Sequence, residues 1–311
     1  FIDYKYRNPV IAQGSTGAGG KNIATRNLVK KRIETLLYGI NNGIKIIDTA
    51  PSYEDGHSEE IVGKAIKKVN RNKIIVCTKV EPDSNSYDGV IKSFKKSLSR
   101  LKTHYIDIYQ VHWPNPGIPI SETMEAFSKL VDDQKIRRIG VCNFTLREIL
   151  EAEKQLENKM IYSVQTEYNL KNRVAEIDLF SFCKSRNKIL FGYNLFNQGY
   201  LKSSKIILNL AEKYGVNEYQ IIVNWSLSNN IIIPILNSMN LKHIQENINA
   251  TKFSLSSKDV KKINKSFIPQ IKLINPKDIQ ILNYDIDKTH KIYTNIKDAM
   301  ENKFMMEPCF G

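Results

Sequence analysis

Eight apolar runs rich in β-branched residues alternate with stretches of helical period along residues 1–268, and this predicts a (β/α)8 barrel, the α/β fold also called a TIM barrel. The chain of 311 residues is long enough for one such barrel with a full core. Polar side chains close several of the runs, where parallel barrels carry their chemistry. A doubly wound sheet would also show alternation, but it would need fewer strands or a second domain, so we rank it second.

The predicted strands are short runs dominated by Ile and Val. The first lies in PVIAQGSTG near the start, and the others are 44–48, 73–79, 105–112, 136–142, 160–165, 188–194 and 230–235. Amphipathic stretches between them predict helices near 25–40, 57–70, 88–102, 121–134, 145–156, 174–186, 204–214 and 217–229. Three helices have start signals, because Ser58, Ser121 and Thr145 stand shortly before acidic residues.

No long Pro, Gly or Ser linker interrupts residues 1–268, which we therefore assign to one barrel domain. The sequence pattern changes in residues 269–311, which contain a short apolar strand-like piece, a Pro turn and an amphipathic stretch. This C-terminal extension faintly resembles the start of a ParB-type nuclease-like domain. The alternative is an ordinary extension that covers the barrel mouth.

The net charge of +14 does not by itself indicate nucleic acid, since the lysines are scattered over helical patterns and fill their solvent faces. Nucleic acid is therefore not an expected partner. No run approaches the length of a membrane span, and the start lacks an apolar signal segment, although the missing initial Met suggests a trimmed chain. We expect a cytoplasmic protein.

The four cysteines, Cys77, Cys142, Cys183 and Cys309, are far apart and form no CxxC pair. Cys77 and Cys142 lie in predicted strands, so reduced core thiols are expected rather than disulfides or zinc ligands. We expect no metal site.

Four polar residues stand alone near the ends of apolar runs. Asp48 closes IKIIDTA, Tyr53 follows it, Lys79 closes KIIVCTK and His112 closes YIDIYQVH. Their convergence on one pocket is the economical interpretation. Taken singly, Tyr53 could be a surface turn residue, Lys79 and Asp48 a structural ion pair, and His112 a satisfied structural histidine.

The stretch DTAPSYEDGHSEEIVGKAI, followed by Lys79 and His112 at the next two strand ends, resembles the aldo-keto reductase family. The match continues in order through GVCNF, VQTEYNL, FGYNLFNQGYL and PILNSMNLKHIQEN, and covers about residues 5–268. The resemblance implies an NAD(P)H-dependent oxidoreductase that reduces an aldehyde, ketone or sugar-derived carbonyl. In that reaction Tyr53 would be the proton donor, and Lys79 would make this phenol, whose ordinary pKa is about 10, more acidic. Asp48 would balance the ammonium, and His112 would orient the substrate oxygen.

The same resemblance implies the cofactor residues. Asn143 and Gln165 would bind the nicotinamide carboxamide, and Tyr193 would stack on the ring. Cys142 stands where a small polar residue is usual. The loop with Asn197 and Gly199 would lie along the pyrophosphate of the cofactor, although its sequence LFNQG departs from the family pattern. The adenosine end of the cofactor would contact Asn237, Ser238, His243, Glu246 and Asn247.

NADP(H) is the expected cofactor on the family resemblance, with NAD(H) close behind. Asn237 and His243 stand where NADP-selective members usually carry a Lys and an Arg for the 2′-phosphate, and each charge-assisted contact is worth about 1.5–3 kcal/mol. Lys242 could compensate for their loss.

Substrate choice is expected in the loops 81–89 and 112–119, where Trp113 is a candidate aromatic wall of the pocket; ordinary packing under the loop is the alternative. No Arg cluster marks a charged substrate.

Two other functions compete with catalysis. The barrel could bind the cofactor as a regulatory or redox-sensing protein with slow turnover, or the tail could make it a nucleic-acid-associated protein. The predicted outer helices show no heptad seam, so we expect a monomer, with a dimer as the alternative.

Overall fold

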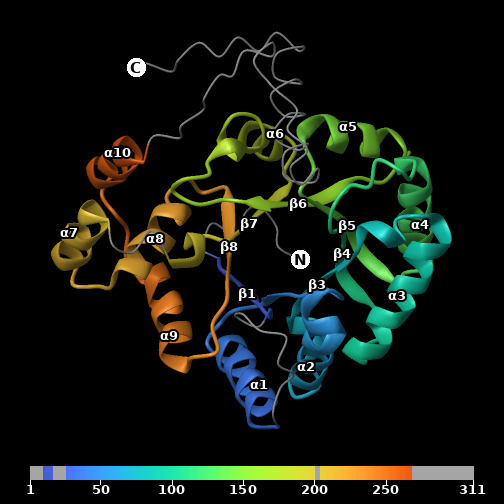
Figure 1. Ribbon diagram of the computed structural model, residues 1–311, viewed down its shortest axis with the longest axis horizontal. Helices are drawn as coiled ribbons and strands as arrows, with labels where there is room; N and C mark the ends of the chain where they lie inside the picture. Colours follow the sequence, from blue (N-terminus) through green and yellow to red (C-terminus); the bar gives the residue numbers. More distant parts are fainter. Residues whose placement is uncertain (1–9, 17–25, 200–203, 268–311) are drawn as a thin grey trace, which may run out of the picture. The chain divides into compact units, whose positions relative to one another are not determined.

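The computed structural model describes residues 10–16, 26–199 and 204–267, which form a closed barrel of parallel strands surrounded by helices (Figure 1). The strands pair in chain order and the first pairs with the last: β1 (Ala12–Gly14), β2 (Ile46–Asp48), β3 (Ile75–Val80), β4 (Ile106–Val111), β5 (Ile136–Cys142), β6 (Ile161–Glu167), β7 (Ile189–Tyr193) and β8 (Ile232–Leu236). Every predicted strand is present. The (β/α)8 barrel is confirmed, and the doubly wound alternative is wrong.

The helices lie outside the strands and alternate with them along the chain (Figure 1). They are α1 (Arg26–Asn41), α2 (His57–Ile66), α3 (Tyr87–Leu101), α4 (Ile120–Asp132), α5 (Leu146–Lys154), α6 (Leu179–Ser185), α7 (Lys205–Tyr214), α8 (Glu218–Leu227), α9 (Leu241–Asn249) and α10 (Ser257–Ser266). The helix α10 was not predicted from the sequence. It is mostly Ser and Lys, and its fully buried positions are Asp259 and Ile263.

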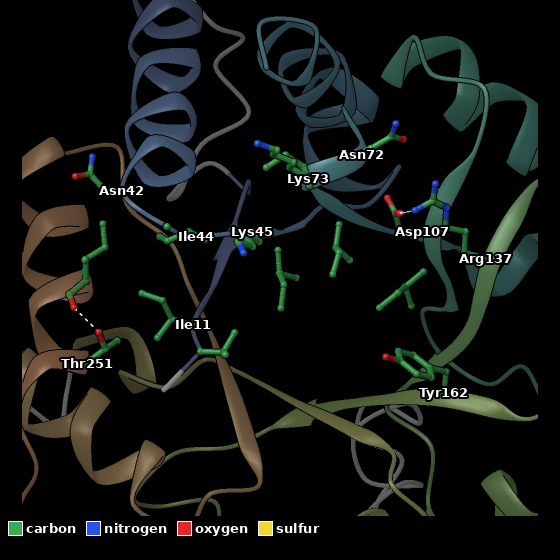
Figure 2. Close-up of a pocket in the computed structure, with 17 residues that line it drawn as sticks. Ile11, Asn42, Ile44, Lys45, Asn72, Lys73, Asp107, Arg137, Tyr162 and Thr251 are labelled. Carbon is green, nitrogen blue, oxygen red and sulfur yellow. Dashed lines mark hydrogen bonds and ion pairs between the residues drawn. The ribbon is translucent and has the colours of Figure 1, made fainter. Parts of the chain in front are cut away.

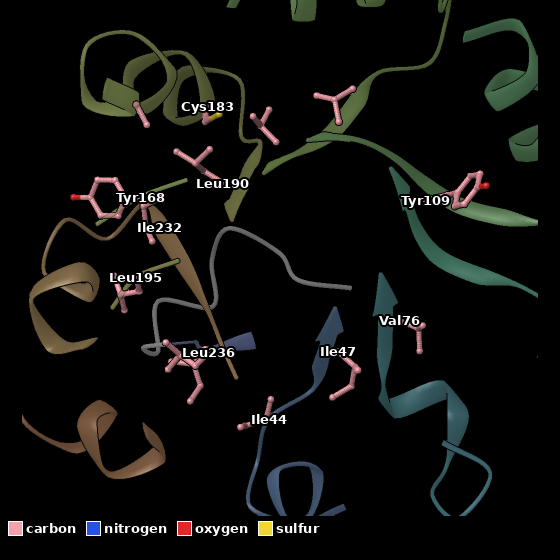
Figure 3. Packing of buried hydrophobic residues seen from close by; sticks show 14 of the residues in the cluster. Ile44, Ile47, Val76, Tyr109, Tyr168, Cys183, Leu190, Leu195, Ile232 and Leu236 are labelled. Atoms are coloured by element: carbon pink, nitrogen blue, oxygen red, sulfur yellow. The ribbon is translucent and has the colours of Figure 1, made fainter. Parts of the chain in front are cut away.

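Strand side chains alternate between the barrel interior and the layer of helices, as the pleat of a β-strand requires. Ile46 and Cys77 belong to a small apolar cluster contributed by several strands, whereas Ile47 packs in the larger cluster between strands and helices (Figure 3). A period of two then places Asp48 and Lys79 on the interior face, in line with Ile46 and Cys77. The polar residues that close these strands therefore enter the barrel mouth.

The start signals of three helices have different outcomes. Thr145 caps α5, where its hydroxyl and the third helical residue form a reciprocal capping box, so this prediction is confirmed. Ser58 and Ser121 do not cap their helices, because α2 is preceded by Gly56 at φ 89° and α4 by Pro119. The hydroxyl of Ser58 is instead buried and donates to the main chain just after β1. That contact joins distant parts of the sequence, which no local pattern encodes.

No helix among the described residues is long and apolar enough to cross a membrane. Cys77 and Cys142 are buried in β3 and β5, as predicted, and Cys183 is buried in α6. Cys309 and the whole extension 269–311 lie outside the described residues, so their interpretation stays a prediction.

Candidate active site

A lysine and an aspartate form a buried ion pair in β3 and at the end of β2. Lys79 Nζ donates to both carboxylate oxygens of Asp48 at 2.9 Å each and to the main-chain oxygen of Thr49 at 2.9 Å. It also donates to the hydroxyl oxygen of Tyr53 at 3.2 Å. The structure thus brings three of the four predicted catalytic side chains into direct contact.

Tyr53 is held by an unusual turn that follows β2. It begins a 3-10 turn in which Glu54 and Asp55 both have φ of 54° and Gly56 has φ of 89°. Left-handed backbone is uncommon for residues other than glycine and persists only where its surroundings fix it. An ion pair between Arg32 of α1 and Glu54 supplies part of that support. The turn is therefore a specific structure that presents Tyr53 to the barrel mouth.

Burial and charge oppose each other in this cluster. Burial is the largest single effect and lowers the pKa of Lys79, but the charge and hydrogen bond of Asp48 together with the charges of Tyr53 and Cys142 raise it overall, so Lys79 is an ammonium at neutral pH. Burial raises the pKa of Tyr53 to about 12, although the Lys79 ammonium opposes this shift. Lys79 lowers the pKa of Tyr53, in the direction expected from the sequence, but burial raises it by more. Lys79 offsets part of the effect of burial, and the phenol keeps the proton that an acid must carry.

His112 completes the cluster immediately after β4. Its ring stands edge-on to Tyr53, with ring centroids 5.9 Å apart and an interplanar angle of 79°. Its Nδ1 lies 2.8 Å from Oε1 of Glu81, and its main-chain oxygen accepts a hydrogen bond from Asn143. Glu81 belongs to the loop 81–89 that was predicted to line the mouth, but no role was predicted for Glu81 itself. It follows Lys79 by two residues, so the period of the strand was the signal that could have found it.

The three residues predicted to surround the nicotinamide are brought together. The Tyr193 hydroxyl donates to Oδ1 of Asn143 at 2.8 Å, and the main-chain N–H of Asn143 donates to the main-chain oxygen of Gln165 at 2.8 Å. Asn143 Nδ2 also lies 3.1 Å from Sγ of Cys142, and Oε1 of Gln165 accepts from Gln110 at 2.8 Å. The amide groups of Asn143 and Gln165 are therefore held in one hydrogen-bonded cluster. Gln110 was missed, although it is two residues before His112 on the same face.

The predicted pyrophosphate loop is a short turn after β7. Asn197, Gln198 and Gly199 have φ of 44°, 56° and 88°. The N–H groups of Asn197 and Gly199 donate to main-chain oxygens within the loop at 2.9 Å. The following residues 200–203 lie outside the described part, and the role of Asn197 and Gly199 stays a prediction.

The predicted adenosine segment joins β8 to α9. Ser238 Oγ lies 3.3 Å from Nδ1 of His243, and Asn237 donates to the main-chain oxygen of Thr16. Asn240 caps α9 by accepting from the N–H of Lys242 at 3.0 Å. These contacts place Asn237, Ser238 and His243 around the start of α9, where main-chain donors favour anions.

Farther along α9, Asn247 is buried, while Lys242 Nζ lies 3.9 Å from Glu246 Oε1 and the Lys242 side chain is 80% exposed. An ammonium held so loosely can reorient at little cost. The Lys242 ammonium is therefore held only loosely near the start of α9.

The two predicted substrate loops are tied to each other. Asn85 Nδ2 donates to the main-chain oxygen of Trp113 at 3.1 Å, and Asn115 Nδ2 donates to that of Pro82 at 3.0 Å. The Trp113 side chain is 37% exposed. A half-exposed indole on a braced loop is consistent with a wall of the mouth.

A cavity of about 780 Å³ opens at the other end of the barrel (Figure 2). Its lining includes Ile46, Ile75 and Ile108, which stand near the amino ends of β2, β3 and β4. None of the predicted site residues lines it. Because parallel barrels carry chemistry at the carboxyl ends of their strands, this cavity is not the candidate active site.

A barrel mouth that holds a phenol beside a buried ammonium offers a proton donor next to a cation, a pair that can serve acid–base chemistry. The model of the Aldo/keto reductase family matches residues 10–267, and the chain belongs to that family. The resemblance read from the sequence is confirmed. The chain is therefore an NAD(P)-dependent oxidoreductase by family.

Individual relatives agree with this membership. The chain is 33% identical to the glyoxal reductase of Bacillus subtilis strain 168 over 74% of this chain and 82% of that protein. It is 29% identical to the methylglyoxal reductase YeaE of Escherichia coli strain K12, over 83% and 91% of the two chains. The solved aldo-keto reductase of Klebsiella pneumoniae in complex with NADPH superposes with a TM-score of 0.79 and 28% identity, over 84% of this chain and 92% of that one.

Proposed function

We propose that this protein reduces a small aldehyde, ketone or sugar-derived carbonyl with NADPH, and that Tyr53 donates the proton. The observation that carries the proposal is the contact of the Tyr53 hydroxyl with Lys79 Nζ at 3.2 Å, in a buried cluster at the barrel mouth. A carbonyl oxygen placed there would meet a protonated phenol that is linked to a permanent ammonium.

The bound nicotinamide would supply the hydride, and the residues of this chain would handle the proton. Tyr53 would release its proton to the oxygen as negative charge develops on it. Lys79 would then stabilise the phenolate, and Asp48, which accepts two hydrogen bonds from Lys79, would hold the ammonium in place. His112 would orient the carbonyl oxygen from the other side of Tyr53.

The residues near the mouth suit a dinucleotide. Asn143 and Gln165 offer amide groups that complement a carboxamide, and Tyr193, which bonds to Asn143, offers an aromatic face. Asn237, Ser238 and His243 would receive the adenosine phosphates at the start of α9, with Glu246 and Asn247 nearer the adenine. Lys242 favours NADP(H) over NAD(H) in this scheme, because it is the cation that can reach an added 2′-phosphate.

Small 2-oxoaldehydes are the proposed first substrates to test. Two of the relatives are named for the reduction of glyoxal and methylglyoxal. The mouth loops carry the half-exposed Trp113, which would form an apolar wall for a compact substrate. We also propose that the protein is a cytoplasmic monomer that does not bind nucleic acid. Size-exclusion chromatography would check the monomer, and a DNA-binding assay would check the absence of nucleic-acid binding.

The test is steady-state oxidation of NADPH with glyoxal, methylglyoxal and a panel of sugar carbonyls. Tyr53→Phe removes only the hydroxyl, and kcat is expected to fall about 10²–10⁴-fold because general acid catalysis is lost. Tyr105→Phe is the matched control. Its hydroxyl contacts Asn72 near the amino end of β4, away from the mouth, and turnover should not change. If Tyr53→Phe retains full turnover, the assigned acid is wrong.

A further inference from the structure

Glu81 makes the side-chain hydrogen bond that reaches the ring of His112. Its Oε1 lies 2.8 Å from Nδ1 of His112, and the side chains of His112 and Glu81 are 13% and 29% exposed. Burial raises the pKa of the Glu81 carboxyl, but the hydrogen bond and charge of His112 and the side-chain and main-chain hydrogen bonds of Ser52 lower it overall. Glu81 is therefore a carboxylate at neutral pH, held from both sides.

An ionised carboxylate can only accept hydrogen bonds. The proton at this contact must therefore sit on Nδ1 of His112, whatever the charge of the ring. It follows that Nε2 carries a proton only when the ring is an imidazolium. In the neutral ring Nε2 is a bare lone pair, which accepts hydrogen bonds and cannot donate them.

This restriction matters because a carbonyl oxygen is also only an acceptor. A neutral His112 with its proton on Nδ1 has nothing to donate to a carbonyl, whereas the imidazolium does. The alcohol product has an O–H group, which can donate to the bare Nε2 of the neutral ring. The protonation state of His112 would thus decide whether carbonyl or alcohol is oriented better.

We propose that Glu81 is a positioning residue that fixes His112 with its proton on Nδ1, so that His112 orients a carbonyl only as an imidazolium and an alcohol as a neutral imidazole. The proposal rests on the proposed function for its kinetic consequence, but not for the state of the ring. Among the residues that the structure describes, the Tyr53 ring also meets His112 edge-on, and Lys79, which contacts the Tyr53 hydroxyl, has its charge paired with Asp48. Within the described part of the chain, Glu81 is the group recorded in contact with a ring nitrogen of His112.

The direct test is NMR of the full chain labelled with 15N-histidine, at a pH where the ring is neutral. Loss of one set of signals in His112→Asn assigns the residue. We expect wild-type His112 to carry its proton on Nδ1, and Glu81→Gln, whose amide can donate to Nδ1, to shift the population toward the Nε2–H tautomer. Glu81→Asp keeps an acceptor and should keep the Nδ1–H tautomer. A wild-type ring protonated on Nε2 would overturn the proposal.

The matched control is Glu60→Gln. Glu60 Oε2 lies 3.1 Å from Nδ1 of His57 in a solvent-exposed pair on α2, so this change makes the same substitution outside the site. It should leave the signals of His112 unaltered. A change at His112 in Glu60→Gln would show that the signals report a general loss of charge, and would count against the proposal.

The kinetic test is the pH profile of kcat/KM for carbonyl reduction. In the wild type this value should fall about tenfold per pH unit above the ionisation of His112, and in Glu81→Gln that slope should flatten, because a neutral Nε2–H can donate. A purely structural role of Glu81 would lower the whole curve without changing its shape. If the chain shows no turnover at all, the proposed function fails, and the NMR result still decides the role of Glu81.

Discussion

Tyr53 shows how burial and charge divide the control of one proton. Burial raises its pKa to about 12 although the Lys79 ammonium works against that rise, so the resting phenol is protonated and harder to ionise than an ordinary phenol in water. The ammonium itself stays charged because Asp48 contacts it through both oxygens. The acid, the cation and the counter-ion therefore depend on one another.

The dependence predicts a stability effect at Asp48. In Asp48→Asn the buried Lys79 ammonium loses its anionic partner, and breaking a buried pair costs about 3–5 kcal/mol of unfolding free energy. Urea unfolding followed by circular dichroism measures this loss. Asp133→Asn is the control, because its pair with Lys129 is 42% and 54% exposed, and it should change stability by less than about 1 kcal/mol. Equal effects of the two variants would contradict the role given to Asp48.

Gly140 of β5 lies between polar side chains of the two neighbouring strands, and its lack of a side chain leaves space for them. A Cβ at Gly140 would lie 2.7 Å from Cγ of Gln110 and would also collide with Ser163 Oγ, both backed by the neighbouring strands. Gly140→Ala should therefore cost about 1–3 kcal/mol through overpacking. It should also weaken cofactor binding, because Gln110 holds Gln165. Gly215→Ala has open space around its Cβ and serves as a comparison for stability alone, although its φ of 63° adds strain.

At the scale of single elements, α5 is fixed by its first turn. The Thr145 hydroxyl accepts from the N–H of Glu148, and the Glu148 carboxylate accepts from the N–H of Thr145. Thr145→Ala should lower the unfolding free energy by about 1 kcal/mol, since an N-cap is lost. Ser121→Ala, at the wrongly predicted cap of α4, should change it much less. Chemical denaturation of both variants checks the contrast.

The helix α10 depends on an ionised aspartate. Asp259 Oδ2 accepts from Lys213, Tyr214 and Ser256, and these hydrogen bonds, that of Lys213 above all, hold the pKa of its carboxyl well below the ordinary value. A lowered folded-state pKa means that the stabilisation is complete above the unfolded value of about 3.9 and is lost as the pH falls below it. Asp259→Asn should therefore be less stable than wild type at pH 7, and the difference should shrink at about pH 3.

Urea unfolding of the two proteins at both pH values checks this expectation. A gap between wild type and Asp259→Asn that stays the same, or grows, in acid would contradict it. The packing of α10 against α7 would then be stabilised by something other than the charge of Asp259.

At the scale of the whole molecule, closure of the barrel gathers strand ends that are distant in sequence. The proposed cofactor contacts run from β5 through β8 into α9. A bound dinucleotide would therefore contact several elements at once and stabilise the folded barrel. NADPH at about 100 times its Kd should stabilise the fold by about 2.7 kcal/mol. A thermal shift assay with NADPH and NADH at equal concentration measures this, and a larger shift with NADH would contradict the preference assigned to Lys242.

The fold and the central cluster could be predicted because their signals are local. The β-branched runs and helical periods are visible in short windows, and Asp48, Lys79 and His112 each follow a run at the point where a strand ends. Glu81 and Gln110 were missed because their importance lies in a contact with another strand. Ser58 was misread for the same reason, since its hydroxyl is used by a segment near β1.

The sequence by itself determined the order of the strands, the order of the helices up to α8, and the strand ends at which Asp48, Lys79 and His112 stand. These follow from periods of two and 3.6 residues, which depend only on backbone geometry. Only the tertiary structure decided that burial outweighs the ammonium at Tyr53, that Asn143 is bonded to Tyr193, and that Glu81 meets His112. Distances between strands and the exclusion of water arise when the barrel closes, and electrostatic energies depend on both.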